Sequence, residues 1–157
     1  MAAGGHVSFP VIATINGQTL HNHYHGNRIS EGDLFLLDTG AENAMHYAGD
    51  LTSTFPVSRT FTEKQKLIYA VQQAAHKASA DTLAPGVPNR DVHFAAARVI
   101  AEGMKDLGLM KGNTDDALAA GAHAMFFPCG LGHMMGLDVH DMENLGEVWV
   151  GWNGEPK

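Results

Sequence analysis

Two aspartates follow or interrupt apolar segments in the first third of the chain. Asp38 ends the apolar run 34–37, and Asp50 lies in the segment 47–55, which has the composition of a second strand. Acids at the ends of neighbouring buried strands are costly unless they are paired or bind a cation. Both are therefore candidate metal ligands. The alternative is that both are turn residues, because each has a glycine within two positions.

Two histidines lie in the glycine- and methionine-rich segment 130–141, GLGHMMGLDVHD. Neutral imidazole binds divalent metals and works as a general acid or base near neutral pH, so His133 and His140 are candidates for either role. Glycines allow the backbone to approach another group closely. The alternative is that both histidines are ordinary surface residues, but the apolar residues on either side of them fit this poorly.

A third group is formed by His21, His23 and His25. On a strand, residues two apart share a face, so the three imidazoles would point one way. This predicts either a solvated edge strand or a metal hydrolase of another fold, although HExxH occurs nowhere in the chain. Cys129 and His133 would form a nucleophile pair only if a third residue oriented them, and none is evident. We expect His6, His76, His93 and His123 to lie on the surface or in loops.

The composition limits the class of protein. The chain has 157 residues, is 45% hydrophobic and has a net charge of −7. Without a Lys/Arg cluster to neutralise phosphates, nucleic acid is not expected as a partner. No apolar run approaches the roughly 18 residues that span a bilayer, and no signal peptide is evident, so no membrane association is expected. The single cysteine, Cys129, favours a cytoplasmic location.

The elements expected to position these residues follow an α+β order. We expect a strand at 11–15 paired with 19–25 in a hairpin, and a strand at 34–37 buried on both faces. Helical spacing predicts a helix at 63–82, a second helix that Asn89 caps and Gly108 follows, and a third at 115–120. Glycines and β-formers after residue 126 predict loop and strand. The whole chain, 1–157, is expected to be one domain.

Taken in order, four segments resemble the pita-bread metallopeptidases of the aminopeptidase P and prolidase group. They are HYHGN at 23–27, FLLDTGAE at 35–42, YAGDLTSTFP at 47–56 and the histidine segment 130–141. The resemblance covers about residues 7–150. It implies a pita-bread fold truncated at both ends. It also implies metal-dependent hydrolysis of peptide bonds next to proline, by an Xaa-Pro aminopeptidase or dipeptidase acting on proline-containing peptides.

The resemblance also assigns roles. Asp38 would bind one metal ion, Asp50 would bridge two, and His133 would bind the other. His23 and His140 would be catalytic residues outside the metal shell, moving protons and holding the substrate. Two divalent ions about 3.5–4 Å apart generate a hydroxide nucleophile and polarise the peptide carbonyl. The ligand types suit Mn²⁺ best, with Co²⁺ or Zn²⁺ as alternatives.

The chain departs from the family pattern in several places. The turn between Asp38 and Asp50 holds one residue more than usual, Cys129 stands where many relatives have histidine, and His21 competes with His23 for the upstream role. The two further glutamate ligands of the family are not matched, because Glu143, Glu147 and Glu155 lie in the wrong context. We therefore expect an inactive partial catalytic domain that binds fewer metal ions or none and forms a homo-oligomer. The other alternative is a non-catalytic binding module of the same fold, but a binding module would not need to keep three ligands.

Overall fold

The computed structural model describes residues 5–146. The described residues form two compact units, one made of residues 5–64 and 133–143, the other of residues 65–132 and 144–146. We call them the β unit and the helical unit. That residues 1–157 act as one domain stays a prediction. Among the described residues, no helix is long and apolar enough to cross a membrane.

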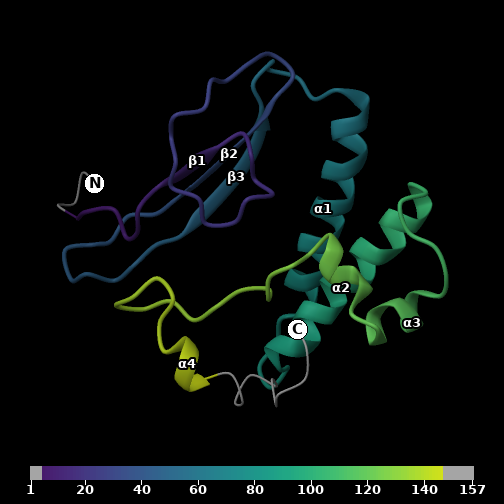
Figure 1. Cartoon of the computed structure of the whole chain (residues 1–157). Helices are drawn as coiled ribbons and strands as arrows, with labels where there is room; N and C mark the ends of the chain where they lie inside the picture. The colour runs from purple at the N-terminus through teal and green to yellow at the C-terminus, as the bar shows by residue number, and fades with distance from the viewer. Residues whose placement is uncertain (1–4, 147–157) are drawn as a thin grey trace. The chain divides into compact units, whose positions relative to one another are not determined.

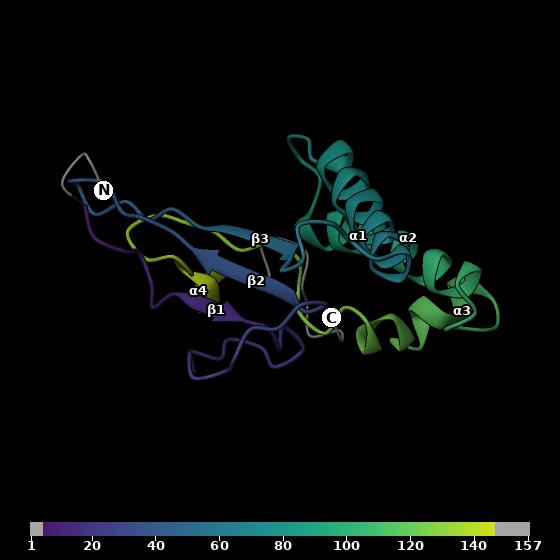
Figure 2. The same cartoon turned by 90° about the horizontal axis from the view of Figure 1, so that it is seen from above.

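The β unit contains an antiparallel sheet in the order β1-β2-β3 (Figure 1, Figure 2). The strands are β1 (Ile12–Thr14), β2 (Leu34–Thr39) and β3 (Leu51–Pro56). In β3, threonine and phenylalanine supply the β-branched and aromatic side chains that favour a pleated sheet. Asp38 pairs with Ile12 on one side and with Thr52 on the other. The sheet therefore carries one candidate ligand on its central strand.

The expected hairpin partner of β1 is wrong, because β1 pairs with β2 and residues 19–25 form no strand. After β1 the chain turns tightly: the backbone N–H of Asn16 donates to Thr14 Oγ1 at 2.9 Å, and that of Thr19 to the Asn16 carbonyl at 2.9 Å. His21 then adopts a left-handed φ of 52°. A left-handed residue breaks the alternation of a strand, so the expected single face of three histidines does not form.

β2 is also less buried than its apolar run suggested. All six of its residues are half-buried, whereas burial on both faces was expected. In β1, Ile12 and Thr14 are buried. The described part of the β unit thus has a small core.

The helical unit is built from α1 (Glu63–Thr82), α2 (Asn89–Asp106), α3 (Thr114–Ala119) and the 3-10 turn η1 (Ala122–Met125) (Figure 1). The predicted bounds of α1 are confirmed. α2 is confirmed too, but Pro88 is its N-cap, and the Asn89 side chain instead donates to the Leu131 carbonyl at 3.1 Å. α3 begins one residue earlier than predicted, because the Asn113 side chain caps it by accepting from two backbone N–H groups.

Small side chains on α2 let the helices of this unit pack closely. Ala96, Ala97 and Ala101 are buried, and a Cβ on Gly103 would lie only 2.7 Å from Val71 of α1.

The expectation that His93 and His123 lie at the surface is wrong, because each is only 1% exposed. His6 and His76 are exposed, as expected.

The chain after residue 126 was expected to contain strands, and this is wrong for the part that the structure describes. Residues 126–142 have no regular element, and they lead into the short helix α4 (Glu143–Gly146). Apolar surface is also expected to be uncovered around Trp149 and Trp152, and these positions lie outside the described residues.

Candidate metal centre

The strand register places Asp38 and Asp50 on one face of the sheet. Directly opposite residues of an antiparallel pair point to the same face, as do residues two apart on one strand. Asp38 is opposite Thr52, and Asp50 comes two residues before Thr52, immediately ahead of β3. Both carboxylates therefore share a face and an end of the β2–β3 pair. The Thr52 hydroxyl donates to Asp38 Oδ1 at 2.7 Å.

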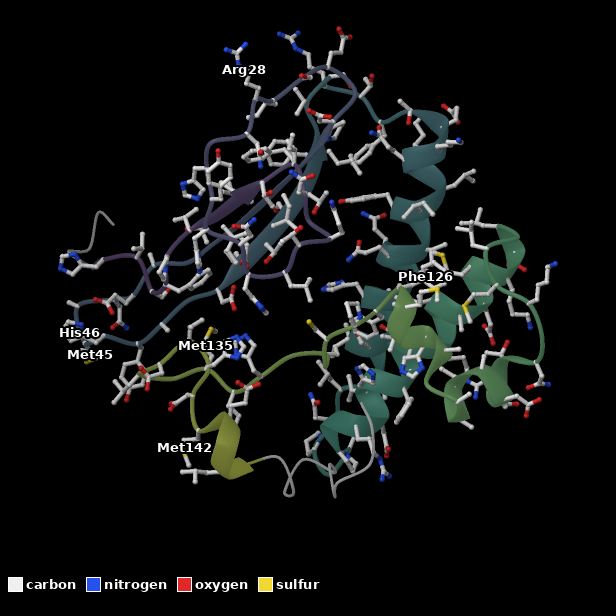
Figure 3. All side chains as sticks on the ribbon, viewed as in Figure 1. Arg28, Met45, His46, Phe126, Met135 and Met142 are labelled. Atoms are coloured by element: carbon white, nitrogen blue, oxygen red, sulfur yellow. The ribbon has the colours of Figure 1, made fainter. Side chains whose placement is uncertain are left out.

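Two glycines hold these strand ends together. A Cβ on Gly40 would overlap the backbone carbonyl of Gly49, so the two strands approach more closely here than any side chain would allow. The turn beyond them is closed by Asn43, whose side chain accepts from the backbone N–H groups of Met45 and Tyr47 at 2.9 and 3.1 Å. Figure 3 shows Met45 and His46 at this turn. His46 takes a left-handed φ of 66°, a conformation that helps the turn close.

The histidine segment is bound to the start of β3 through its backbone. The N–H of Ala48 donates to the Gly136 carbonyl at 2.8 Å. Within the segment, the N–H of Asp141 donates to the Met134 carbonyl at 3.0 Å, which folds it into a loop. Met135 and Met142, labelled in Figure 3, lie on this part of the chain. His133, which is 83 positions beyond Asp50 in the sequence, is thereby brought next to it.

His133 contacts Asp50 directly. Its Nε2 lies 3.1 Å from Asp50 Oδ2, and the two side chains are 19% and 24% exposed. Its Nδ1 lies 3.0 Å from the Met134 carbonyl. A carbonyl only accepts, so Nδ1 carries a proton. In the neutral ring, Nε2 then directs a lone pair at a carboxylate oxygen, and this contact is favourable only with a proton or a cation between them.

His140 packs on His133. The two ring centroids are 3.8 Å apart and the rings are nearly parallel, at 11°. His140 Nδ1 also lies 2.8 Å from Glu143 Oε2. The stack and the hydrogen bond together fix the ring of His140 beside the Asp50–His133 contact.

Among the described residues, no hydrogen bond or ring contact joins the other residues predicted for the site to Asp50, His133 or His140. His23 is exposed, and no hydrogen bond or ring contact joins it to another described residue. His25 Nε2 contacts the Val11 carbonyl at 2.9 Å. Cys129 is a free, half-buried thiol in the helical unit. Within residues 5–146, no group of three or more His, Cys, Asp or Glu side chains is arranged to hold a metal ion.

Sequence reasoning missed three groups that contact the candidate ligands: the Thr52 hydroxyl, the Met134 carbonyl and the Glu143 carboxylate. Only Thr52 had a usable signal, because it follows Asp50 by two residues and so shares its strand face. A backbone carbonyl leaves no mark in the sequence.

The donor set of the predicted ligands suits a divalent cation by the types of its atoms. It offers carboxylate oxygens from Asp38 and Asp50 and an imidazole nitrogen from His133, which suit Mn²⁺, Co²⁺ or Zn²⁺. Metal-binding histidines usually donate their other N–H to a carbonyl or carboxylate, which fixes the tautomer. His133 already makes this bond with Met134. Asp38 is likewise held by Thr52, as ligating carboxylates usually are.

Comparison with known proteins identifies the same class. The model of metallopeptidase family M24 matches residues 1–156. The Xaa-Pro aminopeptidases of Haemophilus influenzae and Escherichia coli are each 39% identical to this chain over 132 residues, which is 84% of the chain and 30% of either relative. The chain thus spans about 30% of the length of these relatives.

Solved structures agree on the fold. Zn-substituted Escherichia coli aminopeptidase P in complex with product matches with a TM-score of 0.82 and 38% identity, over 87% of this chain and 31% of that one. The aminopeptidase of Pseudomonas aeruginosa matches with a TM-score of 0.84 and 36% identity, over 88% and 32%. The expected pita-bread architecture is confirmed for the matched portion.

Proposed function

Because this chain belongs to metallopeptidase family M24, we propose that it contributes part of the metal centre of a peptidase that hydrolyses peptide bonds next to proline. The relatives named above are Xaa-Pro aminopeptidases. This favours removal of an N-terminal residue that precedes proline over cleavage of a dipeptide. The substrates are then peptides with proline as their second residue.

The observation that carries the proposal is the Asp50–His133 contact. Residues from two distant segments place a carboxylate and an imidazole nitrogen 3.1 Å apart, and the sheet register adds Asp38 to the same face. Each acidic ligand position predicted from the sequence therefore lies at one end of the sheet. A non-catalytic binding module would not require this donor set.

Each residue has a distinct proposed role. Asp38 and Asp50 would hold the metal ions, with Asp50 shared between two of them, and His133 would complete the site through Nε2. When bound, divalent ions polarise a peptide carbonyl and supply a nucleophile at neutral pH. His140, stacked on His133, is placed to accept or return a proton. His23 is proposed to contact the substrate, which needs its exposed segment to approach the site.

Family M24 implies divalent metal ions, and the matched Escherichia coli structure is described as Zn-substituted. We propose Mn²⁺ as the native ion because most of the donors are carboxylate oxygens. The single cysteine excludes an internal disulfide, which supports a cytoplasmic setting.

Metal binding by the purified chain tests the proposal. We expect weak binding of one Mn²⁺ ion. Binding is measured as the decrease of the free-ion signal in electron paramagnetic resonance. Asp38→Asn, Asp50→Asn and His133→Gln should each weaken it about tenfold or more, because losing even an outer partner of a ligand costs 10–100-fold. Glu42→Gln is the matched control, since it alters a different His–carboxylate pair of the β unit, Glu42–His46 at 3.0 Å.

The result would contradict the proposal if Glu42→Gln weakened binding as much as Asp50→Asn. Mn²⁺ binding that none of the three ligand variants weakened would contradict it too. Circular dichroism of each variant would show that the fold is retained.

This chain by itself is expected to be inactive and to self-associate. Three proposed ligands balance the charge of two ions poorly, so turnover of an Xaa-Pro peptide with excess Mn²⁺ should stay well below about 1 s⁻¹. Strand β3 is an edge strand in the described sheet, and Leu51 and Phe55 on it are 79% and 44% exposed. A second copy would cover such an edge. A monomeric mass in light scattering would contradict self-association, and ordinary turnover would contradict inactivity.

A further inference from the structure

We propose that Glu143 is a positioning residue for His140, and that it decides which ring nitrogen of His140 carries the proton. Its part in the reaction rests on the proposed function above. The hydrogen bond itself can be tested without metal or substrate.

The contact between the two side chains defines the proton arrangement. His140 Nδ1 lies 2.8 Å from Glu143 Oε2. An ionised carboxylate can only accept, so Nδ1 must carry the proton. A neutral imidazole has one N–H, and Nε2 is then left with a free lone pair. Nε2 becomes the nitrogen that can accept a proton or a substrate N–H.

The stack on His133 cannot make this choice alone. Two nearly parallel rings at 3.8 Å fix the plane of His140. A half-turn of the ring within the same stack would exchange the places of nitrogen and carbon atoms with little change in packing. The carboxylate of Glu143 distinguishes the two orientations, because only one of them gives the hydrogen bond.

Asp141, the nearest other carboxylate in the sequence, is directed elsewhere. A Cβ built on Gly136 would overlap Asp141 Oδ2, so that carboxylate lies over Gly136. Glu143 is the first residue of α4 and follows Met142, whose left-handed φ of 52° turns the chain so that the Glu143 carboxylate reaches His140. Local geometry therefore selects Glu143.

The experiment is a long-range ¹H–¹⁵N correlation spectrum of the metal-free chain at about pH 9, where imidazole is neutral. The His140 signals are assigned by their loss in His140→Gln. We expect the Nδ1–H tautomer in the unmodified chain. Glu143→Ala should shift the ratio of tautomers about fivefold toward Nε2–H, because an accepted hydrogen bond is lost. Glu143→Gln should restore much of the original ratio, since its amide oxygen still accepts.

Glu42→Ala is the matched control, because it removes the carboxylate that contacts His46 Nδ1 at 3.0 Å and should leave His140 unchanged. An Nε2–H tautomer in the unmodified chain would overturn the inference, as would an unchanged ratio in Glu143→Ala. Both side chains are about half exposed, 46% and 51%, so the variant should fold. The spectra are recorded without metal, so they test the hydrogen bond independently of Mn²⁺ binding. If the variants of Asp38, Asp50 and His133 did not alter Mn²⁺ binding, that result would count against the proposed function alone.

Discussion

Replacing Gly40 with alanine is expected to destabilise the β unit by about 3 kcal/mol, the upper part of the range for an added group in a filled space. The new Cβ would overlap the carbonyl carbon and oxygen of Gly49 and would lie 2.5 Å from Ser8 Oγ. Backbone atoms cannot rotate away as a side chain does, so the ends of β2 and β3 must separate. Alanine also leaves the unfolded chain fewer conformations, which would stabilise the protein by only about 0.4–1 kcal/mol. The clash is therefore larger than this gain, and the net effect of the substitution is a loss of stability.

The same change should weaken Mn²⁺ binding, because Gly40 lies between the two segments that carry Asp38 and Asp50. Gly17→Ala is the control: its Cβ would lie 3.2 Å from Leu36 Cδ1, which can shift, and at an ordinary 3.8 Å from Leu36 Cβ. Urea unfolding followed by circular dichroism measures both variants. Equal stability of the two would show that the strand ends have room to move apart.

Lowering the pH is expected to destabilise the helical unit through His123. This side chain is 1% exposed, and neither ring nitrogen has a hydrogen-bond partner among the described residues. Burial disfavours the charged imidazolium and lowers the pKa of His123 below its usual value. The unfolded chain, with a pKa near 6.5, then binds the proton more readily than the folded one. The stability is fully present above about pH 6.5 and is lost as the pH falls through the folded pKa.

The measurement is the free energy of unfolding in urea at several pH values between about 5 and 7.5. In this window a single buried histidine can contribute a slope of up to about 1.4 kcal/mol per pH unit. His123→Leu removes the titrating group and should flatten the curve, whatever it does to the stability at neutral pH. His76→Gln, at an exposed position of α1, should leave the slope unchanged. Parallel curves for the unmodified chain and His123→Leu would refute the prediction.

The sequence determined the helices and the class of the protein. Helix α1 occupies the predicted residues, because helical periodicity and capping are local properties of the chain. The ordered segments around Asp38, Asp50 and His133 were sufficient to identify the metallopeptidase family that the comparisons show. The type of chemistry follows from residue types that are visible without a structure.

Only the tertiary structure decided how these residues meet. Strand pairing is a long-range choice, so periodicity could not show that β1 pairs with β2 and leaves residues 19–25 outside the sheet. Burial of His93 and His123 was hidden for a similar reason, since packing of distant segments determines which polar side chains lose water. The tautomer of His133 depends on a backbone carbonyl and a carboxylate 83 residues away. Hydrogen bonds of this kind arise from three-dimensional proximity, and no spacing within the chain encodes them.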